Sequence, residues 1–146
     1  MSSAGSEIGR LTPVMSDSRY LAFIGYFNGD RDYYECHEVM EELWLEEGRS
    51  PLLQGLLQAA VGLHHWDNGN QSGAVKLMSA ALAKLLRYDD EALGLDLGKV
   101  RVDLQRSLDL LTKLEGEVLF VPFLLRIYDE RLSSEVSDWV DSKIVE

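Results

Sequence analysis

The sequence predicts an all-α protein: a single-domain bundle of about five antiparallel helices, followed by short C-terminal helical segments. Three observations predict this fold. Apolar residues recur with the period of an amphipathic helix, no segment alternates apolar and polar residues as strands do, and Gly, Pro and capping residues separate the periodic segments. The linkers are short, so we expect consecutive helices to pack antiparallel.

The first two expected helices cover residues 17–27 and 32–47. Asp32 and Glu35 have the spacing of a capping box, which predicts that the second helix begins at this point. Gly48 follows the last periodic residue and can take the left-handed conformation that commonly ends a helix. These segments therefore predict two helices joined by a short loop.

The third expected helix covers residues 51–68 and is the central one of the bundle. Ser50 is a good N-cap, and Pro51 suits the first helical turn. Nearly every other position is Leu, Ala or Val, which predicts a mostly buried helix. Gly55 and Gly62 each cost about 0.5–1 kcal/mol of helix stability relative to Ala, so we expect a neighbouring helix to pack closely against them.

Two further helices are expected over residues 71–87 and 97–114, each with an apolar stripe that faces the core. The following stretch, VLFVPFLLRIY, is apolar but contains Pro122. It is expected to form a turn and a short helix over the end of the bundle, because proline interrupts a helix. The apolar spacing of residues 136–140 predicts one more short amphipathic helix.

Residues 1–16 are mostly small and polar, which predicts a flexible N-terminal arm before a single helical domain, residues 17–146. This start lacks the hydrophobic segment of a secretory signal. The lone cysteine, Cys36, cannot form an internal disulfide, so nothing indicates an oxidising compartment. These features predict a soluble cytoplasmic protein.

The chain is acidic: 14 basic and 25 acidic residues give it a formal net charge of −11. Such a surface repels phosphate backbones and anionic lipid headgroups. Neither nucleic acid nor a membrane is therefore expected as a partner, and no apolar run approaches the length of about 20 residues needed to cross a bilayer. The sequence does not distinguish between a protein and a small molecule as the partner, and it is compatible with a homo-oligomer.

Charged residues of the second expected helix fall on two parts of its surface. Glu35, Glu38 and Glu42 share the face opposite the apolar one, an arrangement that is typical of a solvated surface. His37 and Glu41 lie four residues apart at the border of the two faces. Such a pair commonly forms a local contact worth about 0.2–0.5 kcal/mol.

The third expected helix carries a polar stripe on an otherwise apolar surface, formed by Gln54, Gln58 and His65. Because buried polar side chains need hydrogen-bond partners, we expect this stripe to meet the acidic second helix. The candidate partners there are His37, Glu38 and Glu41 on one border and Glu35 on the other.

Two functions are compatible with this cluster. In a binding or scaffold protein, the cluster is a buried His/Glu/Gln network that fixes helix register. In a metal-dependent enzyme such as a hydrolase, one divalent transition metal is bound, and its ligands are His37, Glu38, Glu41 and His65. The segment HEVME matches only part of the zincin motif H-E-x-x-H, since Glu41 replaces the second histidine. The lack of a complete catalytic motif favours the binding protein.

Two stretches, YFNGDRDYYECHEVMEELW and LLQGLLQAAVGLHHWDNGNQSGA, resemble a family of bacterial and archaeal proteins, the domain of unknown function 309 (DUF309). The similarity covers roughly residues 20–90 and includes Phe-Asn, Glu-x-His-Glu, Gln-Gly-Leu-x-Gln and Gly-Asn-x-x-Gly-Ala. Met40 stands where the family pattern has leucine, a volume-conserving change. The resemblance implies a small all-helical fold and no known activity. Its polar positions include Glu35, His37, Glu38, Gln58 and His65.

Overall fold

Helices account for nearly all regular structure in the computed structural model, which describes residues 3–145. In chain order the elements are α1 (Ser3–Leu11), the 3₁₀-helix η1 (Thr12–Ser16), α2 (Ser18–Asn28), α3 (Tyr33–Glu46), α4 (Pro51–Asp67), α5 (Gln71–Leu85), β1 (Glu91–Ala92), β2 (Leu95–Asp96), α6 (Leu97–Lys113) and α7 (Glu130–Val145). The predicted all-α fold is confirmed, and α2 to α6 correspond to the five expected helices.

The predicted caps explain where two of these helices begin. At the start of α3, Asp32 Oδ1 accepts a hydrogen bond from the Glu35 N–H at 3.1 Å. At the start of α4, Ser50 Oγ accepts one from the Leu53 N–H at 3.3 Å. Between these helices Gly48 has a φ of 73°, which suits glycine because it has no Cβ.

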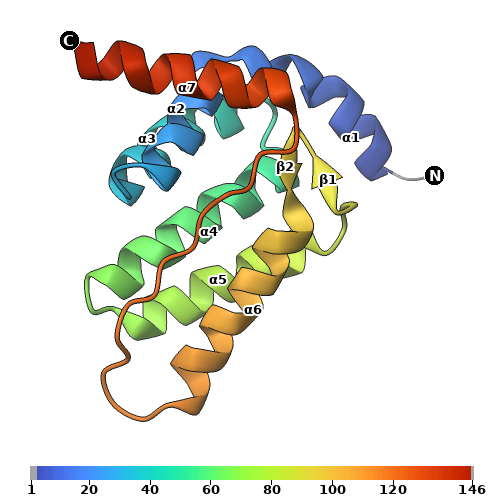
Figure 1. Ribbon diagram of the computed structural model, residues 1–146. Coiled ribbons are helices and arrows are strands. Elements are labelled where there is room, and N and C mark those ends of the chain that lie inside the picture. The colour runs from blue at the N-terminus through green and yellow to red at the C-terminus, as the bar shows by residue number, and fades with distance from the viewer. Residues whose placement is uncertain (1–2, 146) are drawn as a thin grey trace.

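Helix α4 is central, because it packs against α3 on one side and against α5 on another. Helix α2 packs on α3, and α6 packs on α5 (Figure 1). The approach of α5 is close: a Cβ at Gly55 would lie 2.8 Å from Leu85 Cδ2, and one at Gly62 would lie 2.6 Å from Met78 Cγ. The predicted close packing at both glycines is confirmed.

Buried side chains from the helices and from the α6–α7 connection form one continuous hydrophobic core. Tyr20, Phe23 and Phe27 of α2, together with Leu53 and Leu63 of α4, are among its most buried members. Of the helices in the described part of the chain, none combines the length and hydropathy that a membrane span requires.

The expectation of a flexible arm over residues 1–16 is wrong for its described part, which forms α1 and η1. Leu11, at the end of α1, is fully buried. The Glu7 carboxylate accepts hydrogen bonds from the Ser50 hydroxyl and, at 2.6 Å, from the Tyr88 hydroxyl. The small and polar composition of this segment suggests flexibility, because only a few of its side chains contact the rest of the bundle.

The connection from α6 to α7, residues 114–129, contains no helix and only one isolated β-bridge, between Ile127 and Leu95, whereas a turn and a short helix are expected there. In Figure 1 it runs back along the bundle, in front of α4, to reach α7. Trp66 of α4 donates a hydrogen bond from Nε1 to the Val118 carbonyl at 3.0 Å. Pro122 and the residue before it favour extended backbone, which explains the difference. The helix expected around residues 136–140 is confirmed as part of α7, which has 16 residues.

A small hairpin, β1–β2, precedes α6 and is absent from the sequence-based expectation. Its strands pair antiparallel with two residues each. The loop residues Leu93 and Gly94 have φ values of 48° and 78°, and positive values at both positions are characteristic of a type I′ turn. Two residues are too few to show the alternation that identifies a strand.

Candidate functional site

His37 lies on α3 between two carboxylates of the same helix. Its Nε2 is 2.6 Å from Glu41 Oε2, and its Nδ1 is 3.3 Å from Glu38 Oε1. The side chains of His37, Glu38 and Glu41 are 39%, 52% and 43% exposed. The expectation of a buried network is therefore corrected at these residues, because this border of α3 faces solvent.

A small cavity lies between α3 and α4 beside His37. It has a volume of about 190 Å³ and is lined by Tyr33, Tyr34 and His37 of α3 and by Val61 and His64 of α4. We call it the α3–α4 slot. Its lining residues are two histidines, two tyrosines and one valine, a mixture of aromatic, polar and aliphatic side chains.

Tyr33 carries a polar group that the fold leaves unsatisfied. The residue is 2% exposed, and its hydroxyl has no hydrogen-bond partner among the described residues. Burial raises the pKa of Tyr33, and the Arg31 charge partly offsets this effect. The hydroxyl is therefore neutral, and leaving it unpaired costs about 1–3 kcal/mol. The Trp44 Nε1–H, also on α3, is likewise buried without a partner among these residues.

The polar stripe predicted on the third helix exists on α4, but it faces α5. Gln58 Oε1 accepts a hydrogen bond from Lys84 Nζ of α5 at 2.9 Å. His65 Nδ1 lies 3.4 Å from the amide of Asn70, which caps the start of α5. The predicted contact of Gln58 and His65 with α3 is therefore wrong. His64, the neighbour of His65, is the histidine that shares the slot with α3.

The other candidate residues stand apart from the slot. Gln54 and Glu35 are partly buried, and no described residue hydrogen-bonds to either side chain. The outer glutamate Glu42 pairs with Arg19 of α2 at 3.2 Å. Neither Glu35 nor Gln54 lines the slot.

The proposed metal ligands do not assemble into a metal site. His65 lies on the α5 side of α4, whereas His37 lies on α3. Within residues 3–145, no group of three or more His, Cys, Asp and Glu side chains has an arrangement that could hold a metal ion. The expectation of a divalent metal on His37, Glu38, Glu41 and His65 is corrected accordingly.

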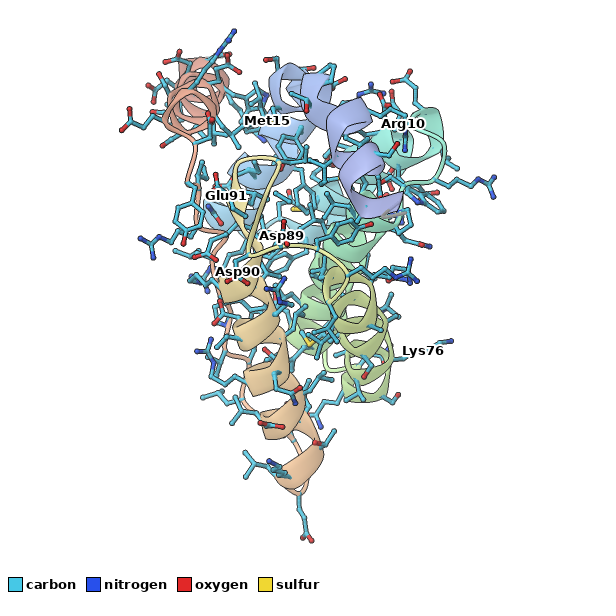
Figure 2. The ribbon with its side chains drawn as sticks, turned by 90° about the vertical axis from the view of Figure 1, so that its right-hand side faces the viewer. Arg10, Met15, Lys76, Asp89, Asp90 and Glu91 are labelled. Atoms are coloured by element: carbon cyan, nitrogen blue, oxygen red, sulfur yellow. The ribbon has the colours of Figure 1, made fainter. Side chains whose placement is uncertain are left out.

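Two other reactive or acidic features have structural roles. Cys36 is buried, and burial raises the pKa of its thiol, so the reactive thiolate is disfavoured. Figure 2 shows Asp89, Asp90 and Glu91 together at the connection from α5 to β1. The Asp90 carboxylate pairs with Arg101 of α6, which ties this connection to the helix that follows.

Comparison with known proteins places this site within a shared segment. The domain of unknown function DUF309 matches residues 20–77, which contain all of α3 and α4 and hence the whole slot. The uncharacterized protein YpuF of Bacillus subtilis (strain 168) is 33% identical over 124 residues, or 81% of this chain and 69% of YpuF.

An uncharacterized protein of Aquifex aeolicus (strain VF5) is 27% identical over 106 residues. These residues are 70% of this chain and 32% of that relative, so the similarity covers about a third of its length. The similarity to YpuF extends over more than two thirds of both chains, and the family match contains the slot. This chain is thus a member of the DUF309 family.

Proposed function

We propose that this chain is a cytoplasmic binding protein that holds a polar side chain of a protein partner in the α3–α4 slot. The observation that carries the proposal is the Tyr33 hydroxyl, which is buried in a residue that lines the slot and has no partner among the described residues. Buried polar groups are almost always paired. A ligand that reaches this hydroxyl gains a hydrogen bond, and the protein has already lost the hydration of that group on folding.

The size of the slot supports a protein side chain as its occupant. Its volume of about 190 Å³ is below the range of about 300–1,000 Å³ that is typical of small-molecule sites. Tyr34 is 57% exposed at the slot, and tyrosine is enriched in protein interfaces. Since two packed helices supply the lining, the slot is formed before a partner arrives.

The test is an NMR titration of ¹⁵N-labelled protein with blocked tripeptides, acetyl-Gly-Xaa-Gly-amide, in which Xaa is Arg, Lys, Glu, Gln, Tyr or Leu. We expect at least one peptide to shift the signals of Tyr34, His37 and His64 saturably, with a dissociation constant on the order of 1 mM for a single side chain. His64→Ala should abolish this shift. His65→Ala is the matched control, because its side chain faces Asn70, and it should keep the shift.

Two results would contradict the binding function. The first is the absence of a saturable shift with all six peptides. The second is an equal loss of binding in His64→Ala and His65→Ala while both variants keep the circular dichroism of the unmodified protein.

A further inference from the structure

We infer that the group held in the α3–α4 slot is the guanidinium of an arginine side chain, presented by an exposed segment of the partner. This inference rests on the proposed binding function and adds the chemical class of the ligand. Four observations point to a planar cation: the carboxylates that flank His37, the unpaired hydroxyl of the lining residue Tyr33, an exposed Tyr34 ring without a cation, and the charge of the whole chain.

The carboxylates beside His37 supply the first argument. Glu41 and Glu38 lie on either side of the imidazole, with nitrogen–oxygen distances of 2.6 and 3.3 Å. Both carboxylates are partly exposed, with 52% exposure for the Glu38 side chain and 43% for the Glu41 side chain, and each carboxylate has more acceptor sites than the imidazole can fill. Both can therefore accept a hydrogen bond from an incoming donor. None of the five lining residues is a lysine or an arginine.

The Tyr33 hydroxyl supplies the second argument. Its oxygen can accept a hydrogen bond, and no described residue gives it one. Asp67 and Arg31 both act on this group electrostatically, in opposite directions. A guanidinium has five N–H donors spread in a fixed plane, so it can donate to more than one acceptor at the same time.

The exposed ring of Tyr34 supplies the third argument. Elsewhere on the described surface, cations of the chain lie over aromatic rings, as Lys143 does over Tyr26 at 3.8 Å and Arg126 over Tyr128 at 5.3 Å. No described cation lies over Tyr34, although the residue is 57% exposed. Arginine stacks on aromatic faces more readily than lysine does, because its charge is delocalised and weakly hydrated.

The net charge of the whole chain also favours a cationic ligand. With a formal net charge of −11, the protein attracts basic segments and repels acidic ones over distances of about the Debye length, roughly 8 Å at physiological salt. A carboxylate ligand would be repelled both by the net negative charge and by the carboxylates of Glu38 and Glu41. The electrostatic argument therefore favours an arginine over an aspartate, a glutamate or a phosphate group.

The experiment compares the dissociation constants of acetyl-Gly-Xaa-Gly-amide peptides with Xaa as Arg, Lys, Gln, Glu, Tyr or Leu. We expect the Arg peptide to bind most tightly, the Lys peptide more weakly, and the Glu peptide to give no saturable shift. Glu41→Gln should weaken binding of the Arg peptide about two- to five-fold, as expected for an exposed ion pair. Glu42→Gln removes the same charge from the same helix but away from the slot, and it should leave binding unchanged.

Tyr33→Phe separates ligand recognition from folding. It removes an unpaired buried hydroxyl, so we expect the variant to unfold at the same or a higher urea concentration. We also expect its affinity for the Arg peptide to fall about two- to ten-fold, the effect of one hydrogen bond. Unchanged affinity in this variant contradicts the inferred contact.

The outcomes distinguish the inference from the function on which it rests. If a Gln, Glu, Tyr or Leu peptide occupies the slot and the Arg peptide does not, the arginine assignment is wrong and the binding function stands. If none of the six peptides binds, both are wrong. Equal weakening of the Arg peptide by Glu41→Gln and Glu42→Gln overturns the placement of the guanidinium in the slot.

Discussion

At the scale of single residues, two side-chain amides attach the α6–α7 connection to the helices. Asn28, at the end of α2, donates to the Leu125 carbonyl and accepts from the Leu125 N–H, both at 2.8 Å. Gln71, at the start of α5, donates to the Gly116 carbonyl at 3.1 Å and accepts from Val118 N–H. These amides provide the backbone pairing that a neighbouring strand would otherwise supply.

Asn28→Ala tests this role. The substitution leaves the N–H and the carbonyl of Leu125 without their partner, and we expect a loss of about 1–3 kcal/mol in the free energy of unfolding. Urea denaturation measures the change, and hydrogen exchange at the Leu125 amide should accelerate. Gln105→Ala is the control: its amide is exposed and contacts Asp109 on the same helix, so a change within about 0.5 kcal/mol is expected. Equal losses in the two variants would show that the connection does not depend on Asn28.

At the scale of elements, the approach of α5 to α4 depends on the absence of side chains at two positions of α4. Gly62 is the tighter position, since an added Cβ would lie 2.6 Å from Met78 Cγ and 3.4 Å from the Met78 nitrogen. The clash involves a carbon near the Met78 backbone, which is less free to move than the tip of the side chain. The helix pair must separate or repack to accept a larger residue.

Gly62→Ala should therefore destabilise the protein, although alanine is the better helix former. We expect a loss of about 1–3 kcal/mol from overpacking. Gly9→Ala is the matched control in α1, where an added Cβ meets no described atom within 4 Å. That change should stabilise by about 0.4–1 kcal/mol. Thermal unfolding of the two variants measures both effects, and a stabilised Gly62→Ala would refute the close-packing argument.

The elements also show which parts of the fold can be predicted from the sequence. Periodicity and caps identify α2 to α6, because each of these helices carries its own apolar stripe and its own end signals. The α1 helix and the α6–α7 connection escape prediction because tertiary contacts determine them. Glu7 is bound by groups of distant segments, and Asn28 binds a residue 97 positions away.

The candidate site could be predicted only in part, again because tertiary contacts determine it. A helical wheel identifies which residues of α4 share a face, and it correctly groups Gln58 with His65. It does not show which neighbouring helix that face meets, and a central helix has several neighbours. The missed histidine, His64, has one local signal: it lies three residues after Val61 and about 100° around the helix from His65. Both Val61 and His64 line the slot.

At the scale of the whole molecule, buried tyrosines link folding to alkaline pH. Burial raises the pKa of Tyr20, Tyr33 and Tyr88, three of the six tyrosines of the chain. In the unfolded chain they ionise near the ordinary tyrosine pKa of 10.0. A group whose pKa is raised by folding stabilises the folded state below the unfolded pKa, and this contribution is lost as pH rises above it.

We therefore expect cooperative unfolding above about pH 11. Above pH 10, each of the three tyrosines lowers the free energy of unfolding by up to about 1.4 kcal/mol per pH unit. Within a few pH units, the summed loss exceeds a typical free energy of unfolding of about 5–15 kcal/mol. Absorbance of tyrosinate at 295 nm and circular dichroism should change together. Tyr33→Phe, which breaks no hydrogen bond of the fold, should reduce the slope by about a third. Ionisation of all six tyrosines near pH 10 with unchanged helicity would show that these side chains are not buried in solution.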